Sequence, residues 1–190
     1  MANGTLIDYI LAMRLAALIA ALPPYARDLG RNLEVLEGET HLSDQQKWGA
    51  FVASANAVAT PGVLRAIETA AAEAGLNETA LTAAKTAAVI MGMNNVYHRA
   101  IHLMENGEYR AMPARLRMSA ASNPGVDKAD FELWELAVSA IHGCGACLDA
   151  HEAALKTHGV TALQIQTALR IAAVVHAVSR VMATQGAAAS

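Results

Sequence analysis

Helix start and stop signals recur along the whole sequence while strand patterns are nearly absent, and this contrast most constrains the fold. Ser43 with Gln46 and Thr161 with Gln164 form capping boxes, in which each side chain satisfies a backbone donor at a helix start. Further boundaries are indicated at Pro23-Pro24, Gly38, Thr60-Pro61, Gly75, Asn77, Asn123-Pro124-Gly125, Gly143 and Gly159. The sequence therefore predicts an all-α fold of about eight to ten helices joined by short loops.

The composition agrees with closely packed helices. Of the 190 residues, 54% are hydrophobic and only 4% are aromatic, and the chain is rich in alanine. Sheets prefer β-branched and aromatic side chains, so this balance favours helices. The length fits one domain, and we expect residues 1–190 to form a single helical domain. Charged residues make up only 16% of the chain, which indicates surface buried between subunits, and the net charge of −3 argues against nucleic-acid binding.

The apolar N-terminal stretch Leu6–Leu22 has the composition of a signal peptide or membrane segment, but two features argue against both. Met1–Thr5 contains no Lys or Arg, which a signal peptide needs. Asp8 and Arg14 would place charges inside a spanning helix. We expect residues 1–17 to form an N-terminal extension helix, buried or at an interface, with no membrane span. The expected location is the cytoplasm, a reducing compartment.

Both cysteines of the chain, Cys144 and Cys147, lie in the stretch AIHGCGACLDAHEAAL, with His142 before them and His151 after them. Two cysteines three residues apart at a helix start can close a disulfide, and the helix dipole favours a thiolate there. His151 is one helical turn beyond Cys147, within reach of its sulfur for proton transfer. The alternatives are inert core cysteines and a zinc site formed by these four residues, but no second Cys-x-x-Cys or His-x-His accompanies the pair. The pair is better explained as a redox couple.

A carboxylate is expected to complete the set. If Gly143 reverses the chain, residues 127–160 form a helical hairpin in which Glu132 and His151 lie at similar distances from the turn. Glu135 is one helical turn from Glu132 and partly on the same face. The spacing alone leaves the choice between the two glutamates open, and it also allows both to lie on a solvated surface.

Several blocks of sequence between about Leu18 and Ala183 carry a resemblance to a known family. These blocks are LPPYARDLGRNL, WGAFVASA, AAVIMGMNNVYHR, LRMSAASNPGVDKADFELW and FELWELAVSAIHGCGACLDAHE. They are similar to the alkylhydroperoxidase D family, within the carboxymuconolactone decarboxylase-like superfamily. The resemblance implies an all-α protein of two related helical halves that assembles as a homotrimer. A faint similarity between Ala87–His102 and Leu136–His151 is what such halves would leave in the sequence.

The resemblance also implies an activity. Members reduce organic hydroperoxides and recycle a partner peroxiredoxin, without a tightly bound cofactor, using electrons from a dihydrolipoyl group on a 2-oxoacid dehydrogenase component. By position, the family's proton-relay glutamate falls on Glu132 rather than Glu135, and its relay histidine falls on His151. Its second cysteine, here Cys147, attacks the peroxide and becomes a sulfenic acid, while Cys144 donates a proton and then forms the disulfide. The helix dipole alone would favour Cys144 as the attacking thiolate, because it lies nearer the helix start.

The chain departs from some family members at Ala146, where they have a second histidine. His142 is the nearest substitute, although a histidine at a helix end is expected to be solvated. His98 and His102 are spaced to hold a metal, but no third ligand is evident and we expect no metal site. The alternatives to a peroxidase are a general disulfide reductase and a decarboxylase-like or interaction protein whose cysteines do not react with peroxide.

Overall fold

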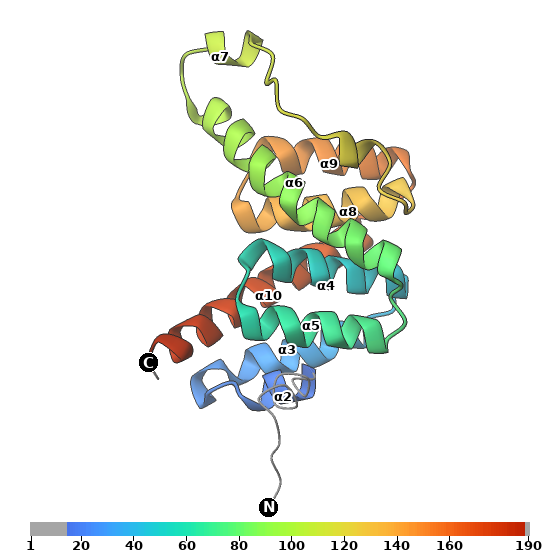
Figure 1. Ribbon diagram of the computed structural model, residues 1–190, viewed down its shortest axis with the longest axis vertical. Helices are drawn as coiled ribbons and strands as arrows, with labels where there is room; N and C mark the ends of the chain where they lie inside the picture. The colour runs from blue at the N-terminus through green and yellow to red at the C-terminus, as the bar shows by residue number, and fades with distance from the viewer. Residues whose placement is uncertain (1–14, 189–190) are drawn as a thin grey trace, which may run out of the picture.

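The computed structural model describes residues 15–188, and every regular element within them is helical (Figure 1). The α-helices are α2 (Leu15–Ala20), α3 (Arg27–Glu37), α4 (Asp44–Val58), α5 (Pro61–Glu73), α6 (Glu78–Leu103), α7 (Glu108–Ala111), α8 (Lys128–His142), α9 (Gly145–Thr157) and α10 (Ala162–Ala188). Two short 3-10 helices lie between them, η1 (Pro24–Ala26) and η2 (Ser119–Ser122). The all-α prediction is confirmed, and the nine α-helices of the described residues agree with the expected number.

The predicted N-terminal extension helix is covered only at its end. Residues 1–14 lie outside the described residues. From Leu15 the chain forms α2, whose Leu15 and Leu18 side chains are buried in the hydrophobic core. This part of the apolar stretch therefore belongs to the hydrophobic core.

Helix boundaries follow the capping signals in the sequence. The Ser43 hydroxyl accepts a hydrogen bond from the backbone N–H of Gln46 at 3.1 Å, and the Gln46 side chain accepts one from the backbone N–H of Ser43. This capping box starts α4. Asn77 starts α6 by accepting a hydrogen bond from the backbone N–H of Ala80 at 2.9 Å. Gly143 ends α8 with φ of 67°, a left-handed conformation that glycine adopts at little cost.

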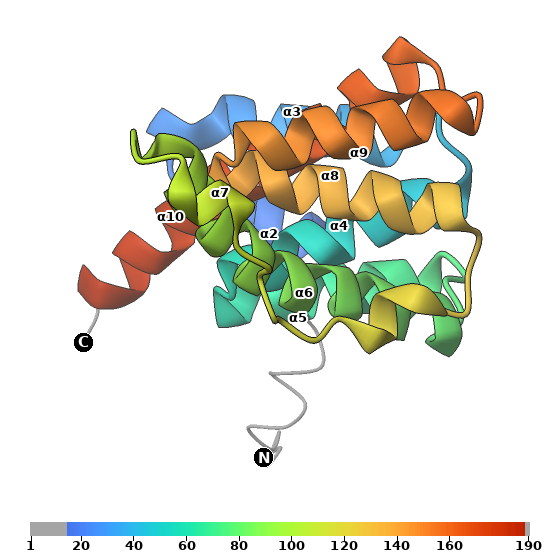
Figure 2. The same cartoon turned by 90° about the horizontal axis from the view of Figure 1, so that it is seen from above.

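Helix α8 occupies the centre of the region that holds the cysteines. Figure 2 shows it between α9 on one side and α4 on the other, and it also packs against α6 and α10. Its close approach to α4 depends on Gly49, since a Cβ atom there would lie 2.1 Å from Cε2 of Trp134. The buried Trp134 indole donates a hydrogen bond to the backbone carbonyl of Gln46 at 3.1 Å. These contacts fix the position of α8 along α4.

Helix α10 is long and apolar enough, by length and composition, to cross a membrane over Ala162–Gly186. The core helix of a globular protein meets the same test. Helix α10 packs against α3, α4, α5 and α8, with Ile171, Val175 and Val178 buried in the common core. We therefore assign it to the core.

The two segments with internal similarity follow different backbone courses. Ala87–His102 lies inside the uninterrupted helix α6. Leu136–His151 is broken at Gly143, which turns the chain from α8 into α9. The similarity therefore does not extend to the chain reversal, which belongs to the cysteine-bearing segment.

Candidate active site

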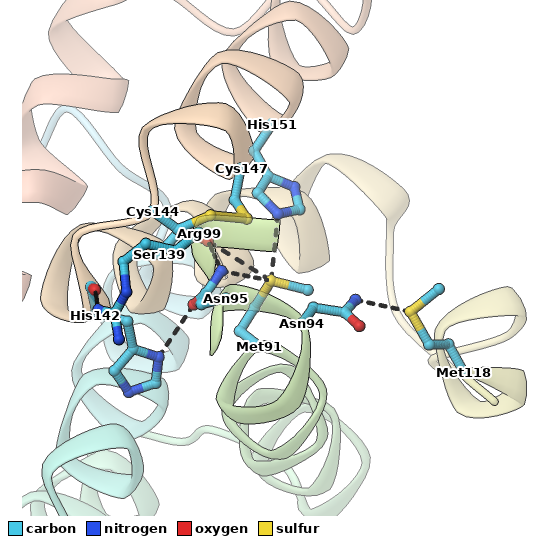
Figure 3. Close-up of a disulfide and its surroundings, with 10 residues drawn as sticks. All are labelled: Met91, Asn94, Asn95, Arg99, Met118, Ser139, His142, Cys144, Cys147 and His151. Carbon is cyan, nitrogen blue, oxygen red and sulfur yellow. Dashed lines mark hydrogen bonds between the residues drawn. A yellow bond between two sulfur atoms is a disulfide. The ribbon is translucent and has the colours of Figure 1, made fainter. Parts of the chain in front are cut away.

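The reversal at Gly143 places Cys144 at the N-cap of α9 and Cys147 in its first turn. Their Cα atoms are 5.3 Å apart and their sulfur atoms form a disulfide (Figure 3), a separation usual for such a bond. The two cysteines differ in access. Cys144 is completely buried, while Cys147 is 7% exposed and lines a cavity. Of the pair, Cys147 is the sulfur that faces a space that a substrate can enter.

Anchoring of α8 on α4 presents Glu132 to the cysteine-bearing helix. Asp130 accepts hydrogen bonds from the side-chain amides of Gln45 at 2.7 Å and Gln46 at 2.8 Å. Glu132, two residues further on, projects from the other side of α8. Its Oε2 atom lies 2.7 Å from Nδ1 of His151 on α9. The hairpin thus joins this glutamate and histidine by a short hydrogen bond, in which the ring N–H donates to the carboxylate.

Glu135, one turn after Glu132, reaches the same imidazole. Its Oε2 atom is 3.8 Å from Nδ1 of His151, and its side chain is 7% exposed, against 16% for that of Glu132. Burial raises the pKa of Glu135 to about 7. The positive charges of His151 and Lys128 lower this pKa, and the negative charge of Glu132 raises it further. Near neutral pH the site therefore contains a carboxyl group that exchanges a proton beside an imidazole.

The other ring nitrogen of His151 faces sulfur. Nε2 lies 3.3 Å from Sδ of Met91, and a thioether accepts hydrogen bonds but donates none. When Nε2 carries a proton, Met91 is thus its acceptor. Figure 3 shows the imidazole beside the disulfide, with the Met91 side chain between His151 and the α6 backbone.

A cavity of about 220 Å³ opens beside the disulfide. Its lining residues are Met91, Asn94, His98, Ala146, Cys147, Ala150 and His151. Alanine and methionine side chains supply an apolar wall, and Cys147 and His151 line the same cavity. Such a space can hold an apolar group with a polar end directed at Cys147.

Comparison with known proteins identifies the family. Residues 107–190 match the carboxymuconolactone decarboxylase family. "Alkyl hydroperoxide reductase AhpD" of Maricaulis maris is 58% identical over 173 residues, which cover 91% of this chain and 99% of that protein. The protein of the same name from Hyphomonas neptunium is 58% identical, covering 94% of this chain and 98% of its own. That of Caulobacter vibrioides strain NA1000 is 53% identical, covering 92% and 96%.

The chain belongs to the AhpD family. The resemblance read from its sequence blocks is thereby confirmed. The small side chain of Ala146 forms part of the cavity wall beside Cys147.

His142 lies at the end of α8 and is not among the residues that line the cavity beside Cys147. Its Nδ1 atom lies 3.0 Å from Oδ1 of Asn95, it is half-buried, and burial lowers its pKa. The prediction of a solvated His142 is therefore wrong. The physical reason is that α6 covers this end of α8, where the Arg99 guanidinium also donates a hydrogen bond to the His142 carbonyl.

A buried polar cluster beneath the disulfide was missed by the sequence analysis. Asn95 donates a hydrogen bond to Oγ of Ser139 at 2.9 Å, and that hydroxyl lies 3.5 Å from the Met91 sulfur. Neighbouring Asn94 donates to the sulfur of Met118 at 2.7 Å. Two adjacent asparagines inside an apolar helix were the available signal, because buried amides require partners.

The carboxylates of Glu132 and Glu135 and the imidazole of His151 also offer ligand atoms within 4.8 Å of one another, close enough to hold a metal ion. Acidic groups are often arranged in this way without an ion. Two of the three groups, Glu132 and His151, are paired with each other by a short hydrogen bond, an arrangement that can pass a proton. His98 and His102 are exposed and belong to no such cluster among residues 15–188.

Proposed function

We propose that this protein is an alkyl hydroperoxide reductase that works through Cys144 and Cys147. The observation that carries the proposal is the disulfide between a buried cysteine and a cavity-lining cysteine, next to a histidine held by a glutamate. Relatives more than half identical to this chain carry the name of that activity.

In the reduced enzyme, His151 takes the proton of the Cys147 thiol, directly or through a water in the cavity. The Cys147 thiolate attacks the terminal oxygen of the hydroperoxide, so that an S–O bond forms and the O–O bond breaks. The alkoxide receives a proton and leaves as an alcohol, and Cys147 becomes a sulfenic acid. The Cys144 thiol then attacks that sulfur; the disulfide forms and water leaves. Two electrons have passed from the two thiols to the peroxide.

A dithiol must return those electrons, because each turnover ends with the disulfide. We propose a dihydrolipoyl group on a 2-oxoacid dehydrogenase component as the donor, with no tightly bound cofactor. Its two thiols match the two-electron exchange, and its flexible apolar arm suits the cavity beside Cys147. The reduced pair is proposed in turn to reduce a peroxiredoxin of the AhpC type by the same exchange.

We propose assembly into a homotrimer, as the family resemblance implies, and an exposed stripe on α6 supports self-association. Val89, Val96 and Leu103 follow one another at intervals of seven residues, and are 74%, 57% and 73% exposed. Side chains at this spacing form one stripe on a helix, and an exposed apolar stripe is a contact surface. Light scattering should give the mass of three chains for the wild type, and Val96→Glu should lower it. A wild-type mass of one chain would reject the trimer. The proposed location is the cytoplasm.

Anaerobic thiol titration tests the function. The reduced protein should lose two thiols per chain when a small excess of an organic hydroperoxide is added, and dihydrolipoamide should restore them. Loss of no thiols would leave the non-peroxidatic alternatives. Restoration by thioredoxin and dihydrolipoamide at equal rates would instead support a general disulfide reductase.

A further inference from the structure

A second cavity lies on the carboxylate side of His151. Its volume is about 470 Å³, and its lining includes Met118, Lys128, Phe131, Glu132 and Glu135. It shares none of its lining residues with the cavity that contains Cys147 and His151. The site is therefore open on two sides, with Cys147 on one side and the carboxyl groups of Glu132 and Glu135 on the other.

The imidazole of His151 connects the two sides. Its Nε2 atom faces Met91 on the wall of the cysteine cavity, and its Nδ1 atom faces the oxygens of Glu132 and Glu135. An imidazole that takes a proton at one nitrogen can release another from its second nitrogen. A proton accepted from Cys147 thus becomes available to a carboxylate at Nδ1.

The two carboxylates are not equivalent acceptors. Glu132 makes the 2.7 Å hydrogen bond that holds the ring, and a carboxylate in this position stabilises an imidazolium best while it stays ionised. Glu135 is more deeply buried, and its Oε2 atom lies 3.8 Å from Nδ1, too far for a hydrogen bond that would hold the ring. A proton crosses this gap through one water or after a small shift of either side chain. The pKa of Glu135 is raised to about 7, first by burial, whereas an ordinary glutamic acid is ionised well below neutral pH.

We propose that Glu135 is a second carboxyl group of the relay, which acts through His151 and holds the thiol proton while Cys147 is a thiolate. The transfer converts a thiol and a carboxylate into a thiolate and a carboxylic acid, with no change in oxidation state. After the O–O bond breaks, the same proton returns through His151 to the alkoxide, which leaves as an alcohol. In this scheme His151, rather than the Cys144 thiol that the family resemblance implies, is the proton donor. Glu132 orients the ring by accepting the Nδ1–H hydrogen bond before the transfer and again after the proton has returned. This inference rests on the proposed peroxidase function.

The charged groups facing Glu135 determine how the relay responds to pH. They are His151 from α9 and Glu132 and Lys128 from α8 itself. Since the Lys128 charge lowers the pKa of Glu135, Lys128→Met should raise its titration midpoint. Glu132→Gln should lower the midpoint, because a neighbouring negative charge is removed.

Infrared titration of the oxidised protein tests the protonation directly, without peroxide. At pH 6 ordinary carboxyl groups are ionised, so the remaining carboxylic-acid carbonyl band should belong to Glu135 and should disappear with a midpoint near pH 7. We expect Glu135→Gln to remove this band. Glu152→Gln, an equal charge change at an exposed site beside His151, should keep it. A band that persists in Glu135→Gln, or that only Glu132→Gln removes, would overturn the proposal.

Single-turnover oxidation by an organic hydroperoxide tests the relay. A required carboxylate with a pKa near 7 is about one-tenth ionised at pH 6 and about nine-tenths ionised at pH 8, a factor of about ten in rate. The oxidation rate of Glu135→Gln should lack this tenfold rise between pH 6 and pH 8, whereas the wild type and Glu152→Gln should show it. Helicity should be the same in all three. Superimposable pH profiles would overturn the relay role. A wild type that shows the infrared band but no oxidation would reject the peroxidase function alone.

Discussion

Replacing Glu132 with glutamine separates the shape of the relay from its charge. The glutamine side-chain oxygen can still accept the hydrogen bond that Glu132 accepts from Nδ1 of His151 at 2.7 Å. A hydrogen bond to a charged group contributes about 1–1.5 kcal/mol more than a neutral one, which amounts to about tenfold in the stability of the imidazolium. A complete loss of acid–base assistance would cost about a hundredfold or more. Because Glu135 remains 3.8 Å from the same nitrogen, we expect a fall of about ten- to a hundredfold.

Stopped-flow oxidation of the pre-reduced protein by an organic hydroperoxide measures this rate, and circular dichroism measures helicity. Glu152→Gln removes the same charge from an exposed position on α9 and should react like the wild type. The double variant Glu132→Gln/Glu135→Gln should be slower than Glu132→Gln. An unchanged rate in Glu132→Gln, with unchanged helicity, would show that Glu132 has no part in the relay.

Three further predictions address the cavity, the packing and the pH dependence. Ala146→Leu should fill the cavity beside Cys147. It should slow oxidation by a bulky organic hydroperoxide about tenfold or more relative to oxidation by hydrogen peroxide. An equal effect from Ala153→Leu, at an exposed site on α9, would argue against a substrate cavity. Gly49→Ala, whose Cβ would lie 2.1 Å from Trp134, should lower the free energy of unfolding by more than about 2 kcal/mol in urea. Gly92→Ala, with nothing within 4 Å, should not; similar midpoints for the two would contradict the packing argument. The folded pKa of Glu135, about 7, lies above the unfolded value, so its protonated form stabilises the fold at low pH and this contribution is lost as pH rises to about 7. Between pH 4.5 and 8, the free energy of unfolding of Glu135→Gln should therefore rise by about 3 kcal/mol relative to that of the wild type. A difference between the two proteins that does not change with pH would refute the raised pKa.

The sequence was sufficient for the helices because their boundaries depend on local chemistry. Ser43 with Gln46, Asn77 and Gly143 act on backbone groups within one turn, and each is found at the predicted end. Local sequence could not predict whether the similarity of Ala87–His102 to the cysteine segment includes the chain reversal. Gly92 lies inside a helix, and whether a glycine continues or reverses a helix depends on what packs around it.

The candidate site was only partly predictable. The hairpin spacing placed both glutamates near His151 but left open which one contacts the ring, since side-chain direction over one helical turn depends on neighbouring helices. The structure gives Glu132 the short hydrogen bond and Glu135 the deeper position. Met91 and Asn95 come from α6, far from the cysteines in sequence. Their contacts, and the burial of His142, result from the packing of α6 on α8, which no local pattern encodes.

Labelling of sulfenic acid with dimedone tests most directly which sulfur attacks the peroxide. The structure buries Cys144 completely and places Cys147 on the cavity. In Cys144→Ser, one equivalent of hydroperoxide should oxidise Cys147 and stop at the sulfenic acid, because no second thiol is present. Mass spectrometry should then find dimedone on the peptide that contains Cys147, whereas Cys147→Ser should show little label and no turnover. Strong labelling of Cys144 in Cys147→Ser, with none on Cys147 in Cys144→Ser, would contradict the account and favour the cysteine nearer the helix start.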